Sequence, residues 1–506
     1  MESTGEKEIK SFLLILYLFI LNFNINYKKH ILTLKFVNFS QKNQFNYLKQ
    51  EVKQKMLIEF SVENFRSIKE KVTLSMVASS DRSLENNLIE SDVLKKDKLL
   101  KSAVLYGANA SGKSNVLLAL NFLEDLVTES HKYQKGNKIN RNPFKLDKEY
   151  VSKPSKFEVV FIEKNIKYIY GVSVTYEKIV SEYLYYYPKG KKALIFERSK
   201  TNDYKFSTDQ KTQEFISERT LENVLYLSKS TQENFSKTSE AFNWFKDTLE
   251  VMGPAEYLTL KDSTVKLLNE DPNLKAVILT ALLEADLGIN DVSASIEKIK
   301  MSEIDDLFSS PPNPPATNDL ENLNQEDFKD LTKHLMGFLK LAGKMAGSKE
   351  ELETSEIKIF HKALDKEGKE LSIPFDFNEE SEGTQKLFSL IGLWIDALLN
   401  GRVLVVDELD VKLHYRLNEF LIKLFNDPTQ NKSNAQLIFT THNTNTLNLD
   451  LFRRDQIWFT EKNPEYGNTD LYSLAEFNPR KDENIQKGYL LGRYGAIPFI
   501  KENKIF

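Results

Sequence analysis

One short motif in the chain has the residue types and spacing needed to bind phosphate. Gly107 to Ser114 reads GANASGKS and matches the pattern G-x-x-x-x-G-K-[ST]. In such a loop, backbone N–H groups and the following helix N-terminus bind phosphate oxygens, the lysine reaches the β and γ phosphates, and the serine binds Mg²⁺. We therefore assign Gly107, Asn109, Gly112, Lys113 and Ser114 to nucleotide binding, and Ser114 also to the metal. The alternative is a tight glycine turn that caps a helix.

A second motif places two carboxylates after an unbroken apolar run. Arg402 to Glu408 reads RVLVVDE, which is typical of a buried parallel strand that presents carboxylates at its C-terminal edge. Asp407 is the candidate metal residue and would hold Mg²⁺ through water. Glu408 is the candidate catalytic residue that orients or deprotonates the attacking water. Apolar strands followed by surface acids are common, so this interpretation depends on the phosphate-binding loop.

Two further segments place polar groups at the ends of predicted elements. Gln436 to His442 reads QLIFTTH and predicts a strand that ends at His442, a second catalytic candidate within reach of the γ phosphate. Glu380 to Thr384 reads ESEGT and precedes a helix with an apolar face. Ser381 is predicted to cap this helix, and the Ser-x-Gly start also offers an anion site. The alternatives are a structural histidine and a simple helix cap.

The hydrophobic pattern predicts the elements that would position these residues. An alternating strand begins at Met56, and a second strand is expected over Val72–Val77. The apolar run Ala103–Tyr106 stops at Gly107, and apolar residues recur at helical spacing after Lys113. A strand, a glycine-bounded loop and a helix therefore follow one another, which is the order that phosphate binding requires.

Composition narrows the class of protein. The chain has 506 residues, of which 41% are hydrophobic, so it can bury at least one large core. Its 69 basic and 73 acidic residues give a net charge of −4, which provides no global signal for nucleic-acid binding but leaves a local basic groove open. The absence of cysteine excludes disulfides, zinc–thiolate sites and thiol nucleophiles, and agrees with a reducing compartment. We expect a soluble, cytoplasmic protein.

The order of the motifs resembles the head of ABC-type ATPases, which RecF, SMC and OLD proteins share. The stretch LIEFSVENFRSI, from Leu57 to Ile68, is similar to the opening strand of that head. The resemblance implies that Ser381 and Gly383 contact the γ phosphate bound to the other protomer. It also implies that Asp410 belongs to a loop linking the two sites and that His442 is a switch residue. It therefore implies ATP and Mg²⁺ as ligands and a head-to-tail homodimer.

More narrowly, the chain from residue 56 resembles bacterial AAA/ABC ATPases of phage-defence and abortive-infection systems, of the RloA-like and PARIS ATPase-subunit kind. The segments GANASGKS, ESEGTQKL, DELDVKLH and GYLLGRYGAIP carry this resemblance. It implies a sensor or regulatory subunit that acts with a separate effector protein, such as a nuclease. The signature SEGTQ departs from LSGGQ, and no Q-loop glutamine is identified, so the chemistry assigned to that glutamine is unplaced. Exposed Tyr489, Arg493 and Tyr494 are candidate partner contacts.

The expected fold class is α/β, an ABC-type P-loop head with an antiparallel β subdomain and a helical insertion. An apolar run at Phe12–Leu21 is too short to span a bilayer, which takes about 20 residues, so no membrane partner is expected. Ser309–Asn324 predicts an unstructured connector and Gln325–Met345 a helix. Four regions are predicted: an extension outside the fold (1–55), an N-terminal lobe (56–210), a mainly helical insertion (211–355) and a C-terminal lobe (356–506). The N-terminal lobe contains the P-loop and an antiparallel β meander over residues 157–198.

Three other functions compete with this interpretation. An ABC transporter subunit would have a much shorter stretch between Ser114 and Ser381. An SMC-like or RecF-like DNA-repair ATPase needs a long coiled coil or a basic face, and the sequence has no sustained heptads. A fused nuclease of the OLD type would need an acidic metal-binding domain after His442, where we expect none. An ATP-dependent scaffold with little turnover remains open, and Glu408 argues against it.

Overall fold

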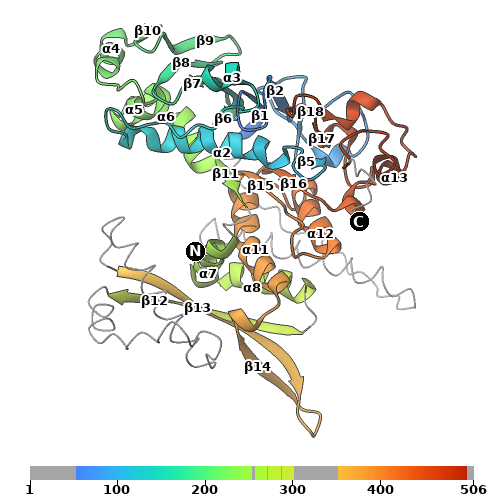
Figure 1. The fold of residues 1–506 in the computed structure, drawn as a ribbon. Coiled ribbons are helices and arrows are strands. Elements are labelled where there is room, and N and C mark those ends of the chain that lie inside the picture. Colours follow the sequence, from blue (N-terminus) through green and yellow to red (C-terminus); the bar gives the residue numbers. More distant parts are fainter. Residues whose placement is uncertain (1–52, 254–256, 271, 286–287, 301–350, 499–506) are drawn as a thin grey trace, which may run out of the picture. The chain divides into compact units, whose positions relative to one another are not determined.

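The computed structural model describes residues 53–253, 257–270, 272–285, 288–300 and 351–498 (Figure 1). The chain divides into two units. The first consists of residues 1–260 and 386–506, and the second of residues 261–385. The predicted connector and the predicted helix between residues 309 and 345 lie outside the described residues. The four predicted regions, with boundaries at 55, 210 and 355, stay a prediction.

The first unit contains a seven-stranded antiparallel sheet with the strand order β10-β9-β8-β7-β6-β1-β2. Its strands alternate or run continuously in Val, Ile, Tyr and Phe, which favour pleated, half-buried surfaces. The turn between β6 and β7 has two residues, Lys164 and Asn165, with φ of 50° and 64°, as a tight hairpin requires. The predicted first strands and meander are therefore confirmed. The strands are β1 (Met56–Glu63), β2 (Val72–Ser75), β6 (Ser155–Glu163), β7 (Ile166–Val174), β8 (Ile179–Tyr186), β9 (Ala193–Ser199) and β10 (Asp203–Phe206).

A six-stranded sheet of the same unit carries the ends of the apolar runs, in the order β11-β15-β16-β5-β17-β18. The first five strands pair in parallel and β18 is antiparallel. The strands are β11 (Leu249–Met252), β15 (Val403–Val406), β16 (Gln436–Thr440), β5 (Ser102–Gly107), β17 (Ile457–Lys462) and β18 (Thr469–Ser473). Every residue of β5, β15 and β16 is buried, as expected for central parallel strands covered on both faces. The edge strand β11 lies in a region predicted to be mainly helical.

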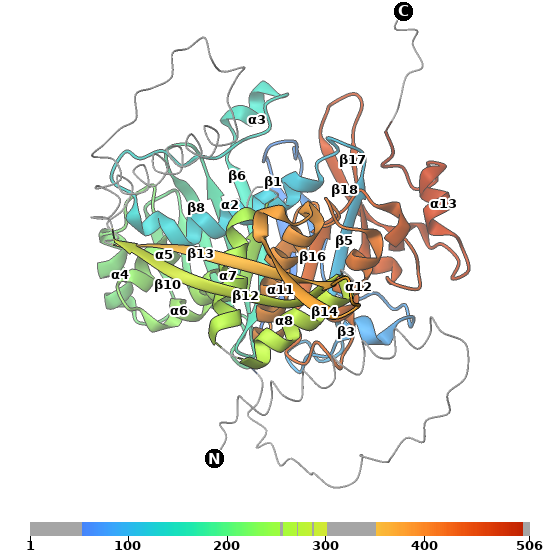
Figure 2. The ribbon, with the colours of Figure 1, turned by 90° about the horizontal axis from the view of Figure 1, so that it is seen from below.

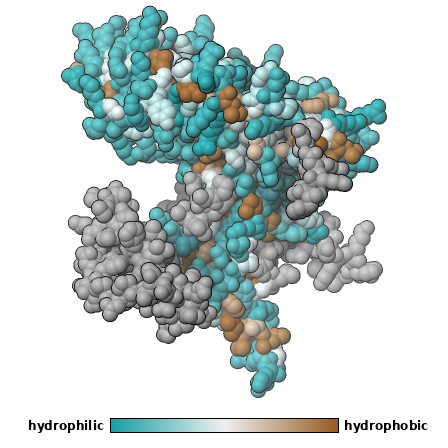
Figure 3. Space-filling model, in the orientation of Figure 1, coloured by the Kyte–Doolittle hydropathy of each residue, from teal (hydrophilic) through white to brown (hydrophobic). Residues whose placement is uncertain are grey.

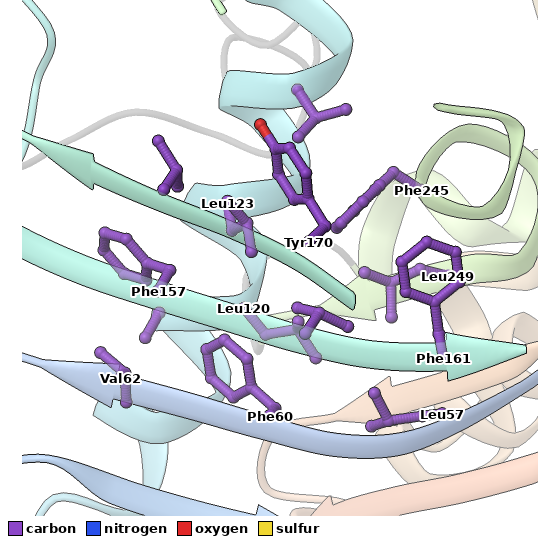
Figure 4. Packing of buried hydrophobic residues seen from close by; sticks show 14 of the residues in the cluster. Leu57, Phe60, Val62, Leu120, Leu123, Phe157, Phe161, Tyr170, Phe245 and Leu249 are labelled. Carbon is purple, nitrogen blue, oxygen red and sulfur yellow. The ribbon is translucent and has the colours of Figure 1, made fainter. Parts of the chain in front are cut away.

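Helix α2 (Lys113–Glu129) packs between the two sheets, and one hydrophobic cluster contains residues of both sheets and of the helix. Leu120 and Leu123 of α2 face Phe157 and Tyr170 of the antiparallel sheet (Figure 4). Burying a side chain of this size stabilises the fold by about 1.5–3 kcal/mol. Helices α11 (Glu382–Asn400) and α12 (Tyr415–Asn426) lie on the side of β15 and β16 opposite α2 (Figures 1 and 2). The six-stranded sheet is thus a central layer between helices.

Short elements complete the first unit. They are β3 (Leu88–Ile89), β4 (Leu99–Leu100), α3 (Lys148–Ser152), α4 (Gln210–Glu218), α5 (Tyr226–Gln232), α6 (Ser236–Asn243) and α13 (Ile485–Leu490). The C-terminal segment corrects one expectation: Tyr489 and Tyr494 are buried, because both rings stack on Phe459 of β17. Of the three proposed contact residues only Arg493 is exposed, and it is paired with Glu483.

The second unit combines two helices with a three-stranded antiparallel sheet of order β12-β13-β14. Ile357 and Ile359 of β13 are buried, whereas every residue of the edge strand β14 is exposed. Figure 3 shows the resulting apolar surface on the β13–β14 hairpin, where Leu371, Ile373 and Phe375 are exposed. The elements are α7 (Tyr257–Glu270), which belongs to this unit from Lys261 onward, α8 (Pro272–Ala285), β12 (Ile289–Lys300), β13 (Glu351–Leu364) and β14 (Glu370–Asp376).

Candidate functional site

The predicted phosphate loop connects β5 to α2, as its sequence indicates. Lys113 is buried, and its ammonium group donates hydrogen bonds to the carbonyl oxygens of Gly107 (2.8 Å) and Ala108 (3.2 Å). Gly112 has a φ of 110°, and a Cβ atom there would collide with the Thr469 side chain. The loop therefore needs glycine at its last turn for both conformation and space.

Neighbouring strands hold this loop in place through hydroxyl groups. Ser111 Oγ lies 2.6 Å from Thr460 Oγ1 of β17, and Thr469 Oγ1 of β18 donates to the Ser111 carbonyl at 2.8 Å. Ser67, in the turn after β1, hydrogen-bonds Thr469 Oγ1 at 2.7 Å and accepts from Asn115 Nδ2 at 2.6 Å. These contacts fix the start of α2 to the edge of the sheet, and a fixed site loses less conformational entropy when a ligand binds.

The two acidic residues after β15 share one buried hydroxyl group, Asp407 through its carboxylate and Glu408 through its backbone N–H. Asp407 is buried, and its Oδ1 accepts a 2.6 Å hydrogen bond from Thr440 Oγ1 at the end of β16. The same Thr440 oxygen accepts from the N–H of Glu408 at 2.7 Å. Glu408 has a φ of 53°, a left-handed conformation that costs a non-glycine residue of order 1–3 kcal/mol. Thr440 thus helps to hold both candidate acids in place.

The turn that follows Glu408 is tied to the end of β16 and to α11. The N–H of His442 donates to the Asp410 carboxylate, at 3.3 Å and 3.2 Å from its two oxygens. Lys386 of α11 is buried and donates to the backbone carbonyls of Glu408, Leu409 and Val411. Burial lowers the pKa of Lys386 to about 8, although the carboxylates of Asp410 and Glu408 raise it.

Six of the predicted site residues line one pocket of about 770 Å³ at the edge of the six-stranded sheet. Burial lowers the pKa of Lys113 to about 8, while Asp407, Glu408 and Asp410 raise it, so three carboxylates act electrostatically on the loop lysine. Gly107, Asp407 and Asp410 adjoin these residues without lining the pocket. The six are Asn109, Gly112, Lys113, Ser114, Glu408 and His442.

The residues present fit a nucleotide phosphate chain with a magnesium ion. A helix N-terminus, a glycine-bounded loop and a buried ammonium group provide donors for phosphate oxygens. The Ser114 hydroxyl and the Asp407 carboxylate are the oxygen ligands that Mg²⁺ prefers. Ser114, in the first turn of α2, and Asp407, directly after β15, are the residues that would hold the ion.

Ser381 and Gly383 belong to the second unit. Ser381 Oγ accepts from the N–H of Thr384 at 3.1 Å and lies 2.8 Å from its Oγ1. Ser381 therefore caps α11, as predicted from its sequence. Contact of Ser381 and Gly383 with a phosphate of another protomer stays a prediction.

The structure adds residues to the site that sequence reasoning missed. Ser67 and Lys462 line the same pocket, and Thr440 and Lys386 support its carboxylates. Lys462 could have been predicted from the sequence, because it follows the apolar run Ile457 to Phe459 as Asp407 and His442 follow the apolar runs of β15 and β16. No local pattern marks Lys386 or Thr440, because their partners lie elsewhere in the chain.

One family model matches more than half of the chain. The family model described as "AAA domain, putative AbiEii toxin, Type IV TA system" matches residues 102–448, more than half of the chain. No curated protein matches. Among solved structures, the chain is similar to one described as "Crystal structure of the SmcHead bound to the C-winged helix domain of ScpA", with 13% identity and a TM-score of 0.33 over 82% of this chain and 97% of that one. No helix of the described residues is long and apolar enough to cross a membrane.

Proposed function

The chain belongs to the AAA-domain family that it matches, and from this premise we propose that it binds ATP with Mg²⁺ and hydrolyses the γ phosphate. The observation that carries the proposal is the shared pocket of the phosphate loop, Glu408 and His442. A phosphate-binding loop alone supports binding. A carboxylate and a histidine facing the same pocket also support chemistry at the terminal phosphate.

Each residue of the pocket has a distinct proposed role. The loop N–H groups and the Lys113 ammonium bind the β and γ phosphates and neutralise their charge. Ser114 and Asp407 would hold Mg²⁺, which supplies further charge stabilisation on the phosphate oxygens. Glu408 orients the attacking water and accepts its proton. His442, next to the Asp410 carboxylate, donates a hydrogen bond to the γ phosphate.

The proposed active assembly is a head-to-tail homodimer. Ser381 and Gly383 at the start of α11 would bind the γ phosphate held by Lys113 of the second copy. Ser381 is exposed, and a helix N-terminus with a serine cap is a suitable anion site. In this arrangement ATP joins the two heads, and its hydrolysis releases them.

The proposed biological role is that of a sensor or regulatory subunit in an antiphage abortive-infection system that acts with a separate effector. Two observations support it: the family description names an abortive-infection-type toxin and a type IV toxin–antitoxin system, and the motifs resemble defence ATPases. Co-purification of the chain with the products of its neighbouring genes, followed by challenge of cells with phage, tests this role. Protection that persists with Lys113→Ala would contradict an ATP-dependent function.

The test of the enzymatic proposal is Glu408→Gln. The substitution keeps side-chain volume and hydrogen bonding but removes the proton acceptor, so we expect tight ATP binding, at least a hundredfold slower turnover and an ATP-dependent dimer. Turnover is measured by phosphate release and association by sedimentation with and without ATP. The matched control is Glu419→Gln on α12, where the glutamate pairs with Lys423.

Two further variants separate the parts of the proposal. Asp407→Asn should impair nucleotide engagement and turnover together, because it weakens the metal site. Ser381→Arg should block association sterically while each head still binds ATP. Parental turnover in Glu408→Gln refutes the catalytic assignment, and an absence of ATP-dependent association in that variant refutes the shared site.

A further inference from the structure

A buried lysine lies directly behind the candidate catalytic glutamate. The side chain of Lys386 is 6% exposed, and its Nζ lies 3.1 Å from the Glu408 carbonyl oxygen, 3.1 Å from that of Leu409 and 2.8 Å from that of Val411. Lysine is rarely buried, because its ammonium group loses hydration. Here three backbone acceptors within one turn replace the lost water.

The turn that Lys386 binds has a conformation that needs external support. Glu408 is in the left-handed region, with a φ of 53°. Its N–H donates to Thr440 and its carbonyl accepts from Lys386, so both sides of the strained residue are fixed by contacts from other elements. Rotation of the Glu408 backbone would therefore break a hydrogen bond to β16 or to α11.

Lys386 lies on α11, and both Lys386 and Glu408 belong to the first unit. The carbonyls bound by Lys386 belong to the turn that carries Glu408. One side chain of α11 thus holds the backbone of the turn that carries the candidate general base.

We propose that Lys386 is a positioning residue that holds the Glu408 carboxylate in its working orientation. This inference rests on the proposed function, because it assumes that Glu408 acts on water at the γ phosphate. Lys386 is not among the residues that line the pocket. Its effect passes through the backbone of the turn from Glu408 to Val411.

The alternative is that Lys386 only stabilises the fold, and the chain offers a matched control for that case. Lys101 is 2% exposed and donates to the carbonyl oxygen of Asn426 at 3.4 Å. It does not line the pocket either. Lys101→Met and Lys386→Met therefore each remove a buried ammonium group. Of the two ammonium groups, only that of Lys386 supports the turn of Glu408.

The experiment compares Lys386→Met, Lys386→Arg and Lys101→Met in the full chain. We measure the ATP dissociation constant, kcat, KM and the thermal midpoint of each variant. We expect Lys386→Met to bind ATP within about threefold of the parent while its kcat falls at least about tenfold, and Lys386→Arg to recover part of kcat. Lys101→Met is expected to lose thermal stability and to keep its kcat below its unfolding transition.

A double-mutant cycle separates positioning from general loosening. If Lys386 acts through Glu408, then Lys386→Met adds less than about twofold to the loss of turnover in a Glu408→Ala background. Full additivity of the two losses overturns the inference, and so does parental kcat in a folded Lys386→Met. If Lys386→Met does not fold, Lys386→Gln and Lys386→Arg enter the same cycle. A parent without turnover refutes the proposed function itself, whereas a turning-over parent with an unaffected Lys386→Met refutes this inference alone.

Discussion

Thr440→Val removes one hydroxyl group from the centre of the candidate site while leaving side-chain shape nearly unchanged. Thr440 is fully buried. Its hydroxyl donates to Asp407 Oδ1 at 2.6 Å and accepts from the Glu408 N–H at 2.7 Å. Hydrogen bonds to charged groups contribute about 1.5–3 kcal/mol and neutral ones about 0.5–1.5 kcal/mol. The expected loss of unfolding free energy is therefore about 2–4 kcal/mol.

The substitution should also slow the reaction more than it weakens binding. Without the hydroxyl, Asp407 and Glu408 both lose a fixed partner, so we expect at least about tenfold slower ATP turnover and a smaller change in ATP affinity, which depends mainly on the phosphate loop. Urea unfolding can be followed by tryptophan fluorescence, because all three tryptophans, Trp244, Trp394 and Trp458, lie in the first unit. Phosphate release gives the rate.

The control is Thr441→Val, one residue further along the chain. Thr441 is also buried, but its hydroxyl accepts only from the Asn443 N–H at 3.0 Å among the described residues. It should lose less stability and keep its turnover. An unchanged urea midpoint and parental turnover in Thr440→Val would refute the claim that this hydroxyl organises the two acids.

Three other predictions follow from the same contacts. Lys113→Ala should lower ATP affinity at least about tenfold without unfolding the chain, because its ammonium group is the proposed ligand of the β and γ phosphates. Equilibrium binding with a fluorescent ATP analogue checks this. Burial raises the pKa of Glu163 to about 7 from 4.5. The buried carboxyl group therefore contributes to stability in full below pH 4.5, where it is protonated in both the folded and the unfolded chain, and this contribution is lost as pH rises through 7. Glu163→Gln should stabilise the protein by about 2–3 kcal/mol at pH 8 and not at pH 4.5, as measured by urea unfolding. A chain that starts at Lys53 should bind ATP and be more stable by about 1–2 kcal/mol than one that starts at Met56. The reason is that Gln54 forms hydrogen bonds with Asn165, Glu90 and Ser91. Equal thermal midpoints of the two chains would contradict this.

Local patterns were sufficient for the parts of the site that one segment builds. The phosphate loop, with its strand and helix, depends on short-range spacing of Gly, Lys and Ser, and the structure places it between β5 and α2 as predicted. The apolar runs before Asp407 and His442 are parallel strands for the same reason, since continuous burial on both faces requires unbroken apolar sequence. Ser381 caps α11 because capping depends only on the residue at the helix start.

Interactions between distant segments were decided by tertiary structure alone. The strand order β15-β16-β5-β17 brings the ends of strands from separate parts of the chain to one edge, and parallel pairing of this kind leaves no local signal. Burial of Tyr489 and Tyr494 depends on Phe459 as a stacking surface, and β11 forms because β15 offers it an edge. Lys386 and Thr440 acquire their roles only when α11 and β16 approach the turn at Glu408. Their partners there include backbone carbonyl and amide groups. Every residue type has such groups, so the sequence of the turn does not reveal these hydrogen bonds.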